Sequence, residues 1–478
     1  MLDALVETMD RAAGRCDYAD ARRVVRAGER IDTRNGEVET VDVGESDGIG
    51  VRVRVGGGWG FASAREPTAA AAEEALRRAL AVAEAQPAAP AAALAPVEPA
   101  RGEWHGPCEE DPFAVPLERK VDLLLRADEA MRGDPRIVRV HASCLALRTT
   151  RALASTEGAA CVQTTTECGA AIAATAVGGG EAQTRSYPGS HQGGVAAAGW
   201  ERVEALDLPG RAPRVAEEAV ELLLAPECPA GTATVILDGE QLALQLHESV
   251  GHALELDRML GGEASYAGTS WVAPGDLGRL TYGSRRLNVT ADATLPGGLG
   301  TFAWDDEGVP ARSFALVREG TLRAALSSRE SAAAIGLEES GGCARADGHA
   351  RQPIVRMTNV SIEPGDAGSL GDLVAATDRG LYLETNRSWS IDDRRLHFQF
   401  GVEMAREIRG GKLGRVLRNA SYAGVTPRFW GGLDAVCGPG EWRLWGVLNC
   451  GKGEPGQVMH VSHGTAPARF REVEVGVA

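Results

Sequence analysis

Two histidines and a glutamate in the stretch HESVGHALELD, residues 247–257, could bind a metal ion and activate water. Glu248 directly follows His247, and His252 comes five residues after His247. The zinc-peptidase motif HExxH has its second histidine only four residues on, because side chains at i and i+4 share one helical face. On an ideal helix, with 100° per residue, the two histidines would diverge by about 140°. A regular helix therefore excludes a shared metal site.

A single π-bulge between the two histidines restores the geometry, because one extra residue in the turn makes i+5 behave as i+4. Gly251 is a tolerant place for such a bulge. The bulge would also bring Glu255 to within about 20° of His247 around the helix, while Glu248 stays beside the ion as a general base. We therefore predict a metal site here, although two histidines on one helix can also be ordinary, partly buried residues and the motif alone is weak.

A catalytic zinc ion needs three protein ligands and an open position, so a third ligand must come from elsewhere. The candidates for it are Glu255, Cys450, His460 and His463. Cys450 lies in WGVLNCGKGEPGQ, where glycines and turn residues would hold a thiolate on a loop. The alternative for this cysteine is a small hydrophobic residue of the core.

Two other polar stretches offer weaker signals. The same loop matches GxxxxGK from Gly446 to Lys452, but Gly453 stands where a Ser or Thr would hold magnesium, which argues against a nucleotide site. The stretch GGLGTFAWDDEGVP carries Asp305 and Asp306, which could support the metal ligands or contact substrate. Acidic runs of this kind are more often solvated turns.

Helix and hairpin signals indicate the elements that position these groups. The motif helix should start at about Gly239, because Asp238 suits the N-cap position and Gln241 follows as in a capping box. Near the N-terminus an amphipathic helix precedes two strands joined at Asn35-Gly36, the dipeptide that best suits a type I′ turn. Thr68 is expected to cap a further helix.

The length of 478 residues predicts two or three domains. Glycine makes up 60 of these residues and aromatics only 5%, which favours turns, bulges and short strands. We expect an α+β fold with mostly antiparallel sheets and flanking helices. The predicted division is an N-terminal α/β subdomain (1–86), an Ala/Pro-rich linker (87–110), a middle α/β subdomain (111–228) and a larger C-terminal domain with the metal site (229–478).

Charge and composition exclude several classes of function. The formal net charge of −16, without a basic cluster, argues against nucleic-acid binding. No apolar run approaches the ~18 residues of a membrane-spanning helix. Nine cysteines without CxxC pairs, in a chain that starts without a secretory signal, predict reduced thiols in the cytoplasm.

Six stretches in this order resemble the TldD/PmbA family of cytoplasmic metallopeptidases, in particular its catalytic TldD-like branch. They are GIGVRVRVGGGWGFAS, HESVGHALELD, GGLGTFAWDDEGVPA, RQPIVRMTN, LNCGKGEPGQ and VSHGTAPARF, which together span nearly the whole chain. The resemblance implies one zinc ion per active subunit, with His247, His252 and Cys450 as ligands and Glu248 as the base. It also implies a homodimer, or a heterodimer with a PmbA-like subunit, whose closed interior admits only unfolded peptides.

The expected reaction is hydrolysis of a peptide bond by a metal-activated water, with Glu248 taking the proton and returning it to the leaving amine. Extended peptides could add as strands to open sheet edges. The alternative is a non-catalytic peptide-binding or regulatory protein with a structural metal site. A nucleotide-binding regulator that uses Lys452 is a further alternative.

Overall fold

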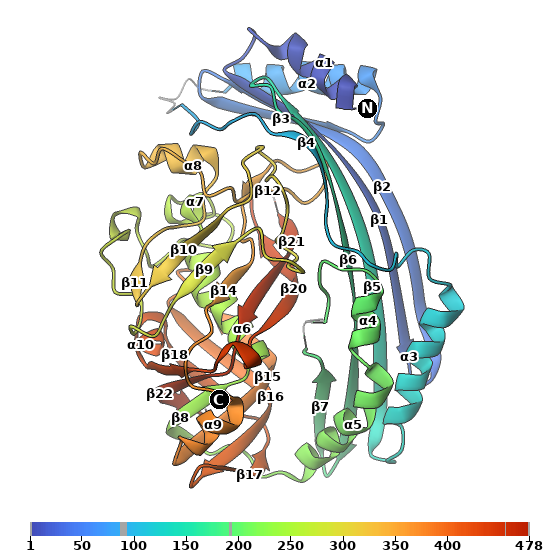
Figure 1. Ribbon diagram of the computed structural model, residues 1–478, viewed down its shortest axis with the longest axis vertical. Helices are drawn as coiled ribbons and strands as arrows, with labels where there is room; N and C mark the ends of the chain where they lie inside the picture. The colour runs from blue at the N-terminus through green and yellow to red at the C-terminus, as the bar shows by residue number, and fades with distance from the viewer. Residues whose placement is uncertain (1, 87–92, 191–193, 455, 477–478) are drawn as a thin grey trace.

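Two seven-stranded sheets organise the residues that the computed structural model describes, which are 2–86, 93–190, 194–454 and 456–476. Figure 1 shows long, curved N-terminal strands on one side and the C-terminal domain packed beside them. Antiparallel pairing dominates both sheets, as the sequence predicts for an α+β fold. Two pairings are parallel, that of β4 (Arg101–His105) with β6 (Ala160–Gly178) and that of β8 (Gly231–Leu237) with β15 (Arg379–Ile391).

The N-terminal sheet has the order β3-β2-β1-β5-β6-β4, with β7 also paired to β6. Helices α1 and α2 pack near one end of it, and α3 and α5 cover β5 and β6 further along. The elements are α1 (Leu2–Ala12), β1 (Tyr18–Arg34), β2 (Glu37–Val55), β3 (Gly58–Ala64), α2 (Ala69–Glu84), β4 (Arg101–His105), α3 (Leu117–Met131), β5 (Ile137–Ser155), β6 (Ala160–Gly178), β7 (Glu181–Tyr187), α4 (Glu201–Ala205) and α5 (Leu208–Leu224).

Local signals in the N-terminal half are confirmed. Asn35 and Gly36 both have positive φ, at 51° and 84°, as a type I′ turn requires, and β1 and β2 pair directly across them. Thr68 accepts a hydrogen bond from the backbone N–H of Ala71 at 3.2 Å and caps α2. The strands are longer than predicted, because the alternating stretch after Gly44 continues β2 without a break.

The first two predicted subdomains share one sheet, because β1 pairs with β5 from Asp20 to Arg34. Of the predicted linker 87–110, residues 87–92 lie outside the described residues. The rest of that stretch includes β4, which pairs with β6. The predicted boundaries thus separate segments of the chain but not separate sheets.

The C-terminal sheet has the order β15-β8-β22-β18-β16-β17, with β19 also paired to β22. Because β15 pairs with β16 as well, the strands β15, β8, β22, β18 and β16 close into a ring. Its aromatic core includes Phe429 stacked on Phe470 at 4.2 Å between ring centroids. The strands of this sheet are β8 (Gly231–Leu237), β15 (Arg379–Ile391), β16 (His397–Arg409), β17 (Lys412–Leu417), β18 (Ser421–Val425), β19 (Leu433–Val436) and β22 (Ala468–Val475).

Shorter elements surround this ring. The helical ones are α6 (Gly239–Leu246), a π-turn (His247–Gly251), a 3₁₀ turn (His252–Leu254), α7 (Leu256–Met259), two 3₁₀ turns (Pro274–Asp276 and Pro439–Glu441), α8 (Arg329–Ala334), α9 (Leu370–Ala375) and α10 (Thr426–Gly431). The strands are β9 (Val289–Asp292), β10 (Ser313–Arg318), β11 (Thr321–Leu322), β12 (Ala344–Arg345), β13 (Ile354–Val355), β14 (Val360–Ile362), β20 (Arg443–Lys452) and β21 (Gln457–Thr465). Within the described ranges, no helix is both long and apolar enough to cross a membrane.

Candidate metal centre

Helix α6 is buried along its whole length and leads from β8 into the predicted motif. Asp238 Oδ1 accepts a hydrogen bond from the backbone N–H of Gln241 at 2.7 Å, so the predicted N-cap is confirmed. The reciprocal half of a capping box does not form, because the Asp238 N–H donates to the Leu383 carbonyl and the Gln241 side-chain oxygen accepts from Asn386 instead. The helix begins at Gly239, as predicted.

A π-turn from His247 to Gly251 follows, which confirms the predicted bulge. The N–H of His252 donates to the carbonyl of His247, five residues back, and thereby closes the wide turn. The carbonyl of Ser249 accepts from the Tyr282 hydroxyl at 2.6 Å, so a buried backbone oxygen in the turn has a partner. Gly251 faces Met357 so closely that a side chain would clash there.

This turn brings His247 and His252 together with Cys450 of β20. Nitrogen atoms of the two imidazoles and the Cys450 sulfur all lie within 4.8 Å of one another. The three side chains are only 1–3% exposed. Among the predicted third ligands, Cys450 is therefore the one that the fold brings to the histidine pair.

The donor set and its spacing fit a zinc ion. Zn–N distances of ~2.0–2.1 Å and a Zn–S distance of ~2.3 Å at tetrahedral angles place the two ligand atoms about 3.6 Å apart. The His252 Nε2 to Cys450 Sγ distance is 3.6 Å. Two imidazoles and a thiolate suit zinc better than the oxygen-seeking magnesium or calcium. Burial lowers the pKa of His247 to about 4 and that of His252 well below its usual value, so both rings are neutral, as ligation requires.

The Cys450 thiol is held in an electropositive setting. Burial alone raises its pKa, but the Arg356 guanidinium and His252 outweigh burial, so that the pKa lies below its ordinary value. Arg356 Nη2 lies 3.1 Å from Cys450 Sγ and also donates to the Cys450 carbonyl. These contacts favour the thiolate that a metal needs.

Glu255 and Lys452 support the ligands from behind. Glu255 Oε2 accepts a hydrogen bond from His252 Nδ1 at 2.9 Å, which turns Nε2 of the ring toward Cys450. Lys452 is fully buried, and its Nζ donates to Asp257 Oδ1 at 2.7 Å and to the carbonyl of Val355, with Glu255 Oε2 at 3.4 Å. The predicted supporting role of Glu255 matches this geometry. Because protein groups enclose Lys452, its ammonium group is not available to bind a phosphate, which argues against the nucleotide-binding alternative.

Glu248, the predicted base, lies on the π-turn and is 6% exposed. Its carboxylate pairs with the guanidinium of Arg395, which stands in the turn between β15 and β16. The Nε of Arg395 is buried without a hydrogen-bond partner among the described residues. The Glu248 side chain is therefore held by a residue far along the chain.

The two other candidate histidines lie outside the cluster of three. Nδ1 of His460 is paired with Glu167 of β6, so this ring faces the N-terminal sheet. His463 contacts the cluster indirectly, since its Nε2 lies 2.8 Å from Nδ1 of His247.

Asp305 and Asp306 hold a loop that packs against the N-terminal sheet. Asp305 accepts hydrogen bonds from the backbone N–H groups of Glu307, Val309 and Ala344, and burial raises its pKa well above the usual range. Asp306 accepts from the N–H of Ala346 at 2.6 Å. These contacts organise the loop and not the metal ligands, so the predicted substrate or supporting role of both aspartates stays a prediction.

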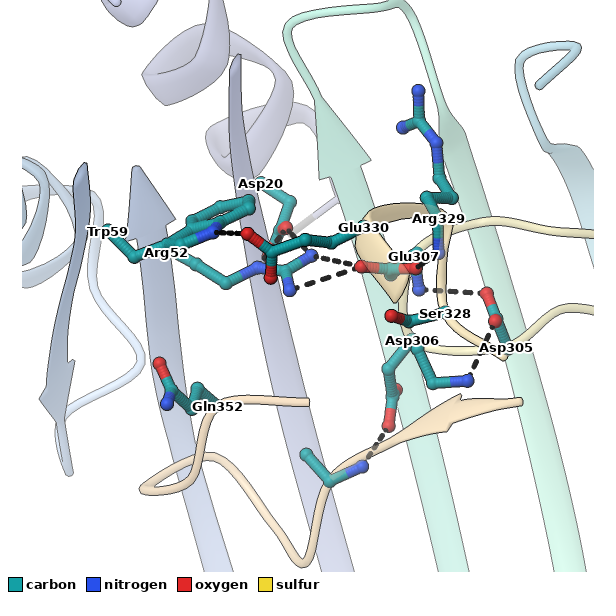
Figure 2. A network of polar contacts seen from close by, with 12 residues as sticks. Asp20, Arg52, Trp59, Asp305, Asp306, Glu307, Ser328, Arg329, Glu330 and Gln352 are labelled. Carbon is teal, nitrogen blue, oxygen red and sulfur yellow. Dashed lines mark hydrogen bonds and ion pairs between the residues drawn. The ribbon is translucent and has the colours of Figure 1, made fainter. Parts of the chain in front are cut away.

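Figure 2 shows how this loop joins the two parts of the molecule. Glu307 Oε1 lies 3.3 Å from Arg52 Nη1 of β2, and Glu307 Oε2 accepts from the N–H of Arg329. Arg52 also pairs with Asp20 of β1. Trp59 of β3 donates its indole N–H to Glu330 at 2.8 Å. The acidic stretch is therefore a buried connection between the sheet and the metal-bearing domain.

Sequence reasoning missed the roles of Arg356, Arg395 and Lys452. The stretch RMTN around Arg356 and the Gly-Lys-Gly loop both stand out in the sequence. No local pattern shows that Arg356 contacts the Cys450 sulfur or that Lys452 contacts the carboxylates of Glu255 and Asp257. Arg395 gives no local signal at all.

Family models for three consecutive domains match the chain. A model of the PmbA/TldA metallopeptidase domain 1 matches residues 19–83, one of the central domain matches residues 110–225, and one of the C-terminal domain matches residues 230–476. The candidate metal centre lies wholly in the third match.

Curated relatives are similar along nearly the whole chain. A metalloprotease of Synechocystis is 30% identical and covers 99% of this chain and 97% of its own length. A metalloprotease of Methanothermobacter thermautotrophicus is 29% identical, with 97% and 96% covered. A metalloprotease described as a TldD homolog, from Haemophilus influenzae, is 27% identical, with 96% and 93% covered.

Solved structures share the fold. TldE from Thermococcus kodakarensis has a TM-score of 0.74 at 15% identity and covers 99% of this chain and 100% of its own. A candidate DNA gyrase modulator from Thermotoga maritima has a TM-score of 0.78 at 16% identity, with 98% and 99% covered. At this identity the likeness concerns the fold alone.

Proposed function

The chain belongs to the PmbA/TldD metallopeptidase family, and on this premise we propose that it is a zinc-dependent peptidase of the TldD type. The observation that carries the proposal is that ligand atoms of His247, His252 and Cys450 lie within 4.8 Å of one another, with Glu248 next to His247 on the π-turn. A bound zinc ion supplies Lewis acidity and lowers the pKa of water at an open position.

The protein's own groups supply the rest of the proposed reaction. His247 and His252 present neutral nitrogens, and Arg356 stabilises the Cys450 thiolate. Glu248 accepts the proton of the attacking water and returns it to the nitrogen of the leaving amine. Arg395 orients that carboxylate through its ion pair.

We propose unfolded peptides or propeptides as substrates. The three ligand side chains are only 1–3% exposed, so a folded protein surface could not reach them. We further propose that cleavage takes place inside a dimer formed with a second copy or with a PmbA-like subunit, as the family resemblance implies.

The variant Glu248→Gln tests the proposal, because it keeps the size of the side chain but removes its proton acceptor. We expect bound zinc, measured by metal analysis, to stay at one ion per active subunit, while hydrolysis of an unstructured fluorogenic peptide library falls by about 10²–10⁴-fold. Glu338→Gln, a change of the same kind on an exposed side chain, serves as the control and should keep full activity. Undiminished cleavage by the Glu248 variant would favour the alternative of a structural metal without catalysis.

A cysteine hydrolase is the second candidate, because the same atoms have the hydrogen bonds of a Cys-His-Glu triad. Cys450 Sγ lies 3.6 Å from His252 Nε2, and His252 Nδ1 lies 2.9 Å from Glu255 Oε2. The two mechanisms differ in their response to metal. Protein freed of metal by a chelator should retain cleavage under the cysteine mechanism and lose it under the zinc mechanism.

A further inference from the structure

A third histidine touches the candidate metal centre without belonging to it. His463 of β21 is fully buried, and its Nε2 lies 2.8 Å from Nδ1 of His247, with the two ring planes nearly perpendicular at 86°. On its other side, Nδ1 of His463 lies 2.7 Å from the backbone carbonyl of Val360 in β14. The three groups form a row that ends at the metal-facing ring.

The chemistry of this row fixes the direction of both hydrogen bonds. A carbonyl oxygen can only accept, so Nδ1 of His463 carries a proton and donates it to Val360. A second proton on Nε2 would make His463 a buried cation, and its contacts among the described residues offer a carbonyl and an imidazole but no carboxylate to balance the charge. Nε2 of His463 is therefore the acceptor, and Nδ1 of His247 is the donor.

We propose that His463 is a positioning residue that makes Nε2 of His247 the metal-binding nitrogen, an inference that rests on the proposed function. With Nδ1 protonated and engaged, the lone pair of the His247 ring stays on Nε2 and its plane is fixed. Without His463, the ring of His247 could take either tautomer and turn about its side-chain bonds. The loss would appear first in metal affinity.

The backbone around His463 is built to hold this ring. The next residue, Gly464, donates its N–H to Ser361 Oγ at 2.9 Å, and Ser462 pairs with Asn359 in a parallel bridge. Both contacts tie β21 to β14, the strand whose Val360 carbonyl accepts from His463. His463 and Val360 are thus kept at hydrogen-bonding distance independently of the ring itself.

The two metal-facing histidines then have different supports. His252 donates to the carboxylate of Glu255, which is itself held by Lys452. His247 donates to a neutral imidazole. In both rings Nδ1 is the hydrogen-bonded nitrogen, so Nε2 is left to bind the metal. The same ligand atom is thus assigned to both rings, although their hydrogen-bond acceptors differ.

Titration of the metal-free full-length protein with Co²⁺, in competition with a chelator and followed by the absorption of the bound ion, tests this role. We expect His463→Leu, of similar bulk but without an acceptor, to lower the affinity by about 10–100-fold. His463→Gln offers an amide oxygen to His247 and an amide N–H to Val360, so it should stay within a few-fold of wild type. His460→Gln on the same strand is the control and should leave the affinity unchanged, since that ring faces Glu167.

The outcomes separate this inference from the proposed function. If the wild-type protein fails to bind Co²⁺ with a thiolate-containing spectrum, the metal site itself is overturned. If the wild type binds and His463→Leu binds equally tightly, only the positioning role is overturned. Should His463→Leu fail to fold, the smaller His463→Val, which also lacks an acceptor, takes its place, and wild-type affinity in that variant would likewise refute the role.

Discussion

Replacing Gly251 by alanine should disturb both the fold and the metal site, because this residue ends the π-turn and precedes His252. A methyl group there would lie 2.1 Å from the Met357 sulfur, whereas non-bonded heavy atoms prefer about 3.5–4.0 Å. Met357 is fully buried, so an overlap of about 1.5 Å must be relieved by moving the turn or repacking the core. We expect the free energy of unfolding to fall by about 1–3 kcal/mol.

A double-mutant cycle measured by urea denaturation of the metal-free protein checks this cause. In a Met357→Ala background the sulfur is gone, so adding Gly251→Ala should be nearly neutral, and the two changes should couple by more than about 0.5 kcal/mol. Gly431→Ala, in α10 with no atom near the added methyl, is the matched control and should not destabilise. Equal costs of Gly251→Ala in the two backgrounds would refute the steric explanation.

Three further outcomes are expected. Burial and the nearby Asp238 raise the pKa of Glu240 from an ordinary 4.5 to about 8. The stabilisation from protonated Glu240 is therefore complete at acid pH and is lost as the pH rises through about 8. The urea concentration at the unfolding midpoint should fall between pH 5 and pH 9, and it should fall less in Glu240→Gln. Lys452→Met leaves the Glu255 and Asp257 carboxylates without their buried cation and should lower the free energy of unfolding, measured in urea, by about 3–5 kcal/mol. A loss below about 1 kcal/mol would show that the Lys452 ion pairs do not stabilise the fold. Removing metal with a chelator should abolish peptide hydrolysis and lower the thermal midpoint, and free zinc at about 100 times its Kd should restore about 2.7 kcal/mol; unchanged calorimetric scans would speak against a bound ion.

Much of the metal centre could be predicted from the sequence because its chemistry is local. The spacing of His247 and His252 requires a π-turn if the two rings bind one ion, and the structure has that turn. The N-cap at Asp238 follows from the same local signals. Glu255 contacts His252, but from an extended residue after a 3₁₀ turn and not from the continued helix that the sequence predicts.

The rest depends on contacts between distant segments, which no periodicity reveals. Arg395 reaches Glu248 across 147 residues, and Arg356 reaches Cys450 across 94. For the same reason the shared N-terminal sheet was not foreseen, since the pairing of β1 with β5 joins segments on either side of the predicted linker. Asp305 and Asp306 stand out in the sequence as candidates for chemistry. In the structure they are buried and accept hydrogen bonds from the backbone N–H groups of Ala344 and Ala346, which lie about 40 residues further along the chain.

The closed ring of strands in the C-terminal domain can form only late in the synthesis of the chain. β8, which leads directly into α6 and the histidines, lies between β15 and β22, and β22 extends to Val475. At ~5–20 residues per second, a ribosome needs roughly ten to fifty seconds to travel from β8 to the end of β22. During that interval the ring stays open and the histidine-bearing helix lacks its final support. The nascent polypeptide therefore cannot close this ring beside the candidate metal centre before its own translation through Val475 is complete.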